Sequence, residues 1–350
     1  MLARNITATV LYDNNDISGD LRKNLLNINY TDNLSGYADT VDITLEDREG
    51  IWQSAWFPDR GATLTVELES ENWHGLEEGS KKLRLGLFEI DQLTTEGYPS
   101  EIKIGAVSVP NNNELRAVCR TRSWEKAELK SIAGDVAADA GMELFYDVEH
   151  NPVIERAEQT EQSALSFLLQ LTSDNGLALK VHENKIVIFD ESDYEQQPPK
   201  LAIVKPGATF VPTTDLLYIT DVLSYSLEAK VRDTYRSCHV KCQDVKTKAV
   251  IEATFTDPQK EDGKTLEIRE QVETIAEAEY LAKKRLREKN CEEWTGSISV
   301  LGNFNLVAAT TALLVGFGAF DGKYIITQAT HSIGRGYQTR TDLRRCLHGY

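Results

Sequence analysis

The stretch from Gly316 to Thr339 is the most informative part of this chain. It reads Gly316-Phe317-Gly318-Ala319-Phe320-Asp321-Gly322-Lys323-Tyr324-Ile325-Ile326, and it continues through His331 and Gly334-Arg335-Gly336 to Tyr337-Gln338-Thr339. Glycine-rich turns alternate with β-branched and aromatic runs, a pattern typical of β-hairpins. The stretch therefore predicts one strand after the first turn and another entering at Tyr337.

The first 122 residues have the same β character. Polar and apolar side chains alternate from Thr40 to Glu46 and again from Ala62 to Leu68, the period of a strand with one buried face. Further strands are expected over residues 83–90 and 101–109. Many short strands joined by turns indicate a β-barrel domain or a sandwich over residues 1–122.

The pattern then changes to a mixture of helices and strands. Apolar residues recur at helical spacing from Leu129 to Ala140 and from Gln162 to Asp174. A hairpin is expected from the runs at 177–181 and 185–189. We therefore predict a small α+β insert over residues 123–200, ending in a proline-containing linker.

Residues 201–350 return to the β pattern, with one helix near 274–289. Thr274 and Glu277 have the spacing of a capping box at the start of that helix. The predicted fold class is thus mainly β with an α+β insert. One antiparallel β domain precedes the insert and a second follows it.

Composition limits the function. The 350 residues carry a formal net charge of −17, which disfavours binding to nucleic acid through phosphate contacts. Five cysteines, an odd number, are scattered along the chain and imply no disulfide framework. No secretory signal is expected, because residues 1–10 contain no apolar run. Stable membrane insertion is not expected either, because the long, nearly uncharged stretch at 306–320 is shorter than the roughly 20 residues of a membrane helix.

The chemical motifs are weak. Cys238-His239-Val240-Lys241-Cys242 is the nearest approach to a metal-ligand cluster, but a second pair at zinc-site spacing is missing. His182-Glu183 starts like a zincin helix and lacks the second histidine. Gly316 and Gly318 are followed by a predicted strand, not by the helix that a phosphate site needs. We expect no catalytic residue, no cofactor and no metal site.

Five segments stand out in order along the chain: Gly86-Leu87-Phe88-Glu89-Ile90-Asp91, Arg120-Thr121-Arg122-Ser123-Trp124, Ser163-Ala164-Leu165-Ser166-Phe167-Leu168, the helix around Ala278-Glu279-Tyr280-Leu281-Ala282 and the Gly316–Thr339 stretch. Together they resemble the late control D-like family of contractile-tail baseplate hub proteins. The resemblance lies in their order over nearly the whole chain, since each segment alone is unspecific.

This resemblance implies a structural protein and not an enzyme. Both β domains would be antiparallel β-barrels that resemble tail-tube subunits, and the insert would be LysM-like. Three copies would form a pseudo-sixfold ring between the tail tube and the central spike. DNA would pass through the ring of a phage, and nothing would pass in a bacteriocin-like particle. The residues that the resemblance singles out as motif or interface candidates are Gly86, Phe88, Asp91, Trp124, Phe317, Phe320, Gly322, Tyr324, His331 and Tyr337.

The expected partners follow from the same resemblance. They are two further copies of the chain, a tail tube protein, a tape-measure or LysM-type baseplate protein and a spike protein. Related secretion spikes continue into a further barrel and needle, whereas this sequence ends at Tyr350, so the spike is expected to be a separate protein. The expected location is the tail baseplate of a virion or of a bacteriocin-like particle that assembles in the bacterial cytoplasm.

Two alternatives remain open at this point. A cell-wall glycan-binding or peptidoglycan-degrading tail-tip protein would use the insert to bind sugar. An unrelated β-sandwich adhesin is the other alternative, although adhesins normally carry an export signal.

Overall fold

A computed structural model describes residues 4–59, 61–75, 77–109, 114–149, 151–243 and 248–350. The chain divides into two compact units. The first comprises Met1–Asp190, Val300–Ala308 and Thr327–Thr341, and the second comprises Glu191–Ser299, Ala309–Ile326 and Asp342–Tyr350.

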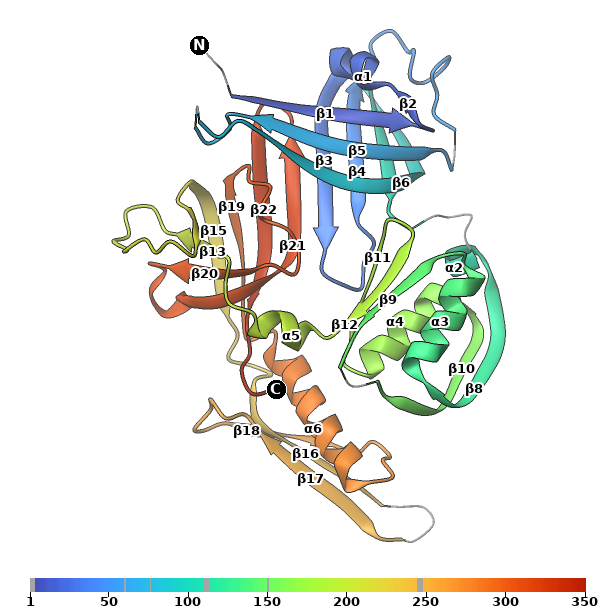
Figure 1. The fold of residues 1–350 in the computed structure, drawn as a ribbon, viewed down its shortest axis with the longest axis vertical. Coiled ribbons are helices and arrows are strands. Elements are labelled where there is room, and N and C mark those ends of the chain that lie inside the picture. Colours follow the sequence, from blue (N-terminus) through green and yellow to red (C-terminus); the bar gives the residue numbers. More distant parts are fainter. Residues whose placement is uncertain (1–3, 60, 76, 110–113, 150, 244–247) are drawn as a thin grey trace. The chain divides into compact units, whose positions relative to one another are not determined.

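The first unit contains an antiparallel sheet with the strand order β3-β4-β7-β6-β5-β1-β2 (Figure 1). Its elements are β1 (Asn5–Tyr12), β2 (Asn15–Asp16), α1 (Ser18–Asn24), β3 (Leu25–Asn33), β4 (Thr40–Glu46), β5 (Thr63–Glu71), β6 (Ser80–Glu96) and β7 (Glu101–Val107). Every second residue of β4 is buried, with Val41, Ile43 and Leu45 in the core. The predicted alternation is therefore confirmed, because one face of the sheet packs inward.

The insert forms a separate core within the first unit. Its elements are α2 (Glu114–Ala117), β8 (Cys119–Glu128), α3 (Leu129–Asp139), β9 (Glu143–Asp147), β10 (Val153–Ser163), α4 (Ala164–Asp174), β11 (Ala178–His182) and β12 (Lys185–Phe189). Helices α3 and α4 lie between the β8–β10 pair and the β9–β12–β11 sheet (Figure 1). The two predicted helices and the predicted hairpin are all present.

Local chemistry explains these elements. The Ser163 hydroxyl accepts a hydrogen bond from the Ser166 backbone N–H at 3.2 Å and caps the start of α4. Glu183 and Asn184 have positive φ angles, as a tight hairpin turn between β11 and β12 requires. The β8–β10 pair was not predicted, because its exposed positions are mostly charged or polar and its apolar alternation is short.

The remaining elements lie in the second unit or cross its boundary with the first unit. They are α5 (Glu191–Gln196), β13 (Leu201–Val204), β14 (Leu217–Ile219), β15 (Val222–Ala229), β16 (Tyr235–Gln243), β17 (Val250–Thr256), β18 (Lys264–Ile268), α6 (Ile275–Asn290), β19 (Trp294–Leu301), β20 (Thr311–Val315), η1 (Gly318–Phe320), β21 (Gly322–Ile333) and β22 (Tyr337–Arg345). The boundary between the units falls within β19, β21 and β22.

Helix α6 lies along one face of the β17–β16–β18 sheet (Figure 1). Its first turn is capped as predicted, since the Thr274 hydroxyl accepts from the Glu277 N–H at 3.1 Å. Ala278, Ala282 and Leu286 of α6 are fully buried. They form a small core with Cys238 and Val240 of β16.

The mainly β fold class with an α+β insert is confirmed. Two details differ from the expectation. Strand β13 pairs in parallel with both β14 and β20, and β16 pairs in parallel with β18, so the second β region is not purely antiparallel. The expected linker at 196–200 begins at the end of a short helix, α5. The division at residues 122 and 200 and the LysM-like character of the insert stay predictions.

Candidate functional site

Three of the motif residues proposed from sequence lie on β6 of the first unit. Gly86 has φ +101° and stands opposite Val66, where the pairing of β5 with β6 shifts. A Cβ at Gly86 would lie 3.1 Å from the imidazole of His182 and 3.2 Å from Glu183, so glycine lets the insert's hairpin turn approach the sheet. Phe88 is buried, and Asp91 is exposed.

Trp124 belongs to the insert, on β8. Its ring stacks on Phe167 with centroids 5.2 Å apart, and its indole N–H donates to Asp135 Oδ2 at 2.9 Å. The Arg122 guanidinium packs over the Trp124 ring, 4.6 Å from its centroid. Trp124 thus joins β8 to α3 and α4.

The structure brings His331 and Tyr337 together inside the first unit. His331 Nδ1 lies 2.7 Å from the Tyr337 hydroxyl, and Nε2 lies 3.0 Å from the Leu306 carbonyl. Burial lowers the pKa of His331 to about 4, although the bond to the carbonyl of Leu306 opposes this shift. The neutral imidazole also stacks on Tyr30. The arrangement is a satisfied, buried hydrogen-bond network.

The other four motif residues lie in the second unit. Phe317 packs edge-on against Tyr225, and Phe320 packs edge-on against Trp294. Gly322 has φ +144° and Tyr324 is fully buried. The Arg345 guanidinium lies 5.5 Å from the Tyr324 ring centroid and 4.3 Å from that of Trp294.

A buried ionic cluster, which we call the Lys180 cluster, was not foreseen from the sequence. Lys180 Nζ pairs with Asp32 Oδ1 and lies 3.1 Å from Asp39 Oδ2. Burial disfavours the ammonium, but the two carboxylates raise the pKa of Lys180 overall. The cluster ties strand β11 of the insert to the end of β3.

The second unit holds a cluster of the opposite kind, the Glu195 cluster. Glu195 at the end of α5 is fully buried, with Arg287 Nη2 at 2.6 Å and Arg344 Nη2 at 2.5 Å. The Leu347 N–H also donates to its carboxylate at 2.8 Å. Burial alone would raise the pKa of Glu195, but Arg344 and Arg287 lower it below the usual range.

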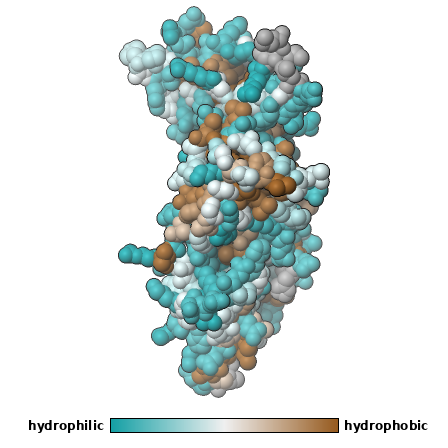
Figure 2. All heavy atoms as spheres, turned by 90° about the vertical axis from the view of Figure 1, so that its left-hand side faces the viewer, coloured by the Kyte–Doolittle hydropathy of each residue, from teal (hydrophilic) through white to brown (hydrophobic). Residues whose placement is uncertain are grey.

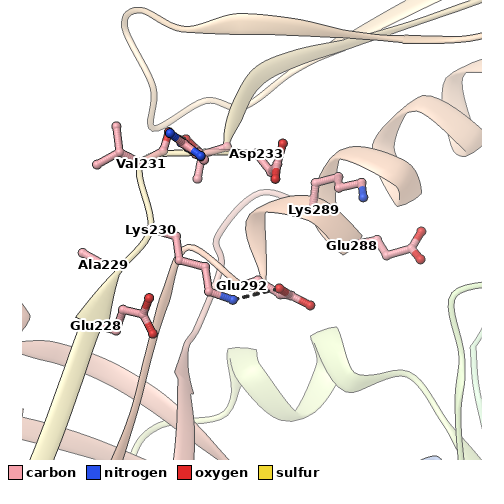
Figure 3. A pocket seen from close by; sticks show the side chains of 10 residues that line it. Glu228, Ala229, Lys230, Val231, Asp233, Glu288, Lys289 and Glu292 are labelled. Atoms are coloured by element: carbon pink, nitrogen blue, oxygen red, sulfur yellow. Dashed lines mark hydrogen bonds and ion pairs between the residues drawn. The ribbon is translucent and has the colours of Figure 1, made fainter.

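A hollow of about 630 Å³ opens between the end of β15 and the end of α6 (Figure 3). Its lining mixes exposed charges of both signs, and Lys230 Nζ lies 3.0 Å from Glu292 Oε2. The lining residues include no histidine, cysteine or serine that could form a nucleophile–base pair. This hollow therefore has no arrangement typical of an active site.

Metal and disulfide chemistry are not indicated by the described residues. Within them, His, Cys, Asp and Glu side chains form no group of three or more that could hold a metal ion. All five cysteines are free thiols, and Cys238 is fully buried, which raises its pKa to about 11. His239 points to the other face of β16 and bonds to Thr254.

Among the described helices, none is long and apolar enough to cross a bilayer.

Strand β15 is the most exposed long strand of the second unit. It has eight residues, none of them buried, and among the described strands it pairs only with β19. Leu223 is 54% exposed and Tyr225 is 46% exposed. The side of the molecule on which β13 and β15 lie carries a group of apolar side chains (Figure 2). A free edge with apolar side chains is an unusual surface for an isolated protein.

The fold is that of phage tail proteins. It matches the tail protein of Neisseria meningitidis MC58 with a TM-score of 0.71 over 97% of this chain and 96% of that chain, at 12% identity. At this identity the likeness concerns the fold alone. No protein-family model matches the chain.

In sequence, the chain is similar to phage baseplate hub proteins. It is 28% identical over 181 residues to the probable baseplate hub protein of Escherichia phage P2, and 27% identical over 175 residues to that of Escherichia phage 186. These matches cover 51% and 50% of this chain and 44% and 42% of the relatives, less than half of their length. The resemblance to baseplate hub proteins is confirmed, and both relatives carry the name of a structural component.

Proposed function

We propose that this chain is a structural baseplate hub of a contractile injection system, without enzymatic activity. Three copies form a pseudo-sixfold ring that joins the tail tube to the central spike, in a virion or a bacteriocin-like particle. The similarity to two baseplate hub proteins and the tail-protein fold support the class of protein.

The exposed edge of β15 is the observation in this molecule that carries the assembly part of the proposal. An eight-residue strand with no buried residue gains little stability from its own chain. Among the described strands β15 pairs only with β19, so its other edge and its exposed Leu223 and Tyr225 suit pairing with a strand of another subunit. Heterologous contacts of this kind close into a ring when the rotation between copies allows it.

The partners follow from the proposed position in the particle. A tail tube protein would meet one face of the ring, and a separate spike protein the other, with a tape-measure or LysM-type baseplate protein nearby. The net charge of −17 suits a wall along which DNA slides without binding.

The molar mass of the purified chain tests the ring. Light scattering after size exclusion should give a mass near three times 39.2 kDa. Leu223→Lys places a charge on the exposed edge of β15 and should yield monomers. The matched control is Ile275→Lys, at a residue 60% exposed at the start of α6 in the same unit, which should leave the mass unchanged.

Two results would contradict the assembly proposal. One is a wild-type monomer that stays monomeric when the tube and spike proteins of the same particle are added. The other is a trimer that Leu223→Lys leaves intact, which would assign the contact to another surface.

A further inference from the structure

An apolar hollow of about 250 Å³ opens in the first unit, beside α1. Its floor consists of core side chains from four strands, Ile43, Leu64, Ile90 and Ile104. A cavity of about 150 Å³ already holds a benzene ring in an engineered protein. This hollow is therefore large enough for one bulky apolar side chain.

The rim of the hollow carries exposed aromatic side chains. Trp56 is 47% exposed and Phe57 is 51% exposed, and both line the hollow. Trp56 packs edge-on against Trp52, with ring centroids 5.3 Å apart. The loop that carries them is held in place, because the Asp47 carboxylate accepts hydrogen bonds from the backbone N–H groups of Trp52 and Gln53 at 3.1 and 3.0 Å. Fixed, exposed aromatic residues around an apolar pocket are typical of protein-binding hot spots.

Acidic groups lie on both sides of this hollow. A second hollow of about 380 Å³ shares Trp52 and Trp56 with it and is lined by four acids, Asp20, Glu46, Asp47 and Glu49, against two bases, Lys23 and Arg48, a balance of −2. One of the bases, Arg48, is already paired with Glu46 at 2.6 Å. A further acid, Asp59, lies beside Tyr12, which lines the apolar hollow: the Tyr12 hydroxyl donates to Asp59 Oδ2 at 3.5 Å and accepts from the Asp59 N–H at 3.0 Å.

We propose that the apolar hollow and its acidic border bind a segment of another protein that presents a bulky apolar side chain flanked by lysine or arginine. The apolar side chain would enter the hollow, whose lining residues include no charged group. The flanking cations would meet the acidic residues around it, which gives the site its charge selectivity. This inference goes beyond the proposed ring, since it concerns a different kind of partner and residues of the first unit only.

A titration with a synthetic peptide tests the site on the full chain. The probe is the acetylated and amidated peptide Gly-Lys-Lys-Phe-Leu-Lys-Lys-Gly, followed through the indole N–H signals of the protein labelled with ¹⁵N-tryptophan. The chain has five tryptophans, so the signals can be assigned by single substitutions. We expect shifts at Trp52 and Trp56, and none at Trp73, Trp124 and Trp294.

Matched variants and peptides separate the two parts of the site. Replacing Phe and Leu of the peptide by alanine should weaken binding about tenfold, and so should Ala55→Trp, which fills the hollow. Phe57→Ala should weaken binding, whereas Phe145→Ala, at a residue 55% exposed on the insert, should not. Glu49→Lys should weaken binding about threefold, and Glu155→Lys should leave it unchanged.

Three outcomes would overturn this inference. They are the absence of indole shifts at millimolar peptide, equally tight binding of a peptide with glutamate in place of lysine, and self-association of the protein that Ala55→Trp abolishes. The last would show that a second copy of the chain occupies the hollow. The first two outcomes do not depend on whether the chain forms a trimer.

Discussion

The two units each contain a buried ionic cluster, and the two clusters have opposite charge patterns. In the first unit one ammonium, that of Lys180, is held by two carboxylates. In the second unit one carboxylate, that of Glu195, is held by two guanidiniums. Both clusters connect segments that are far apart in the sequence, so both serve to fix the tertiary structure of their own unit.

The clusters differ in how completely water is excluded. The side chain of Lys180 is 19% exposed, whereas that of Glu195 is not exposed at all. A charge left without its partner costs most where solvent cannot reach it. The Glu195 cluster should therefore be the more sensitive to the loss of one member.

The largest expected effect is that of Glu195→Gln. The substitution keeps the shape of the side chain but leaves Arg287 and Arg344 without their shared carboxylate. Breaking a buried pair in this way should lower the free energy of unfolding by about 4 kcal/mol. Urea denaturation followed by fluorescence and by hydrogen exchange of α6 peptides would measure the loss.

Glu279→Gln is the matched control for this change. Glu279 lies on the exposed face of α6, and its substitution should alter the free energy of unfolding by less than about 0.5 kcal/mol. If the two variants were equally stable, the Glu195 cluster would not be a stabilising centre of the second unit.

A somewhat smaller loss is expected for Lys180→Met, about 3 kcal/mol. The substitution leaves Asp32 and Asp39 facing each other without a cation. Both carboxylates keep a backbone donor, since Ala308 N–H donates to Asp32 at 2.8 Å and Asn33 N–H donates to Asp39 at 2.9 Å. These bonds, and the partial exposure of Lys180, make the loss smaller than that for Glu195.

Lys185→Met provides the comparison on the same hairpin. Lys185 is 52% exposed and pairs with Glu143 at 3.4 Å on the surface, where an ion pair contributes little. Thermal unfolding should thus show a clear loss for Lys180→Met and almost none for Lys185→Met. Equal midpoints would contradict the role assigned to the Lys180 cluster.

The clusters also show where prediction from sequence ends. The capping of α6 was predicted because Thr274 and Glu277 are three residues apart. The hairpin of β11 and β12 was predicted because its two strands flank a short turn, in which Glu183 and Asn184 are adjacent. Glu195 and Arg287 are 92 residues apart. No local pattern marks such a pair, since charged residues are usually exposed and only the fold brings these two together.

The motif residues teach a similar lesson. The resemblance singled out His331 and Tyr337 but could not say what they do, and the structure shows them bonded to each other in the interior. The short helix α5 carries Glu195, yet its six residues Glu191–Gln196 are too few for a helical period to be recognised. The exposed β15 has an apolar face that a sequence pattern cannot distinguish from a buried one.

The smallest of these effects should appear as a difference in acid sensitivity between the units. The pKa of His331 is about 4 in the folded first unit and about 6.5 in an unfolded chain, so the stability that the neutral imidazole contributes is complete above about pH 6.5 and is lost as the pH falls. Between pH 7 and 5 the loss should be about 2 kcal/mol. The pKa of Glu195 is lowered in the folded second unit, so its contribution is complete above the ordinary glutamate pKa and is lost only as the pH falls from there through the lowered pKa. Comparing urea unfolding of the wild type and His331→Asn at the two pH values isolates the contribution of His331. The carboxylates titrate in both proteins, so their contribution cancels in the comparison. The variant should be less stable at pH 7 and should lose about 2 kcal/mol less on acidification, and parallel losses in both proteins would show that His331 does not titrate on unfolding.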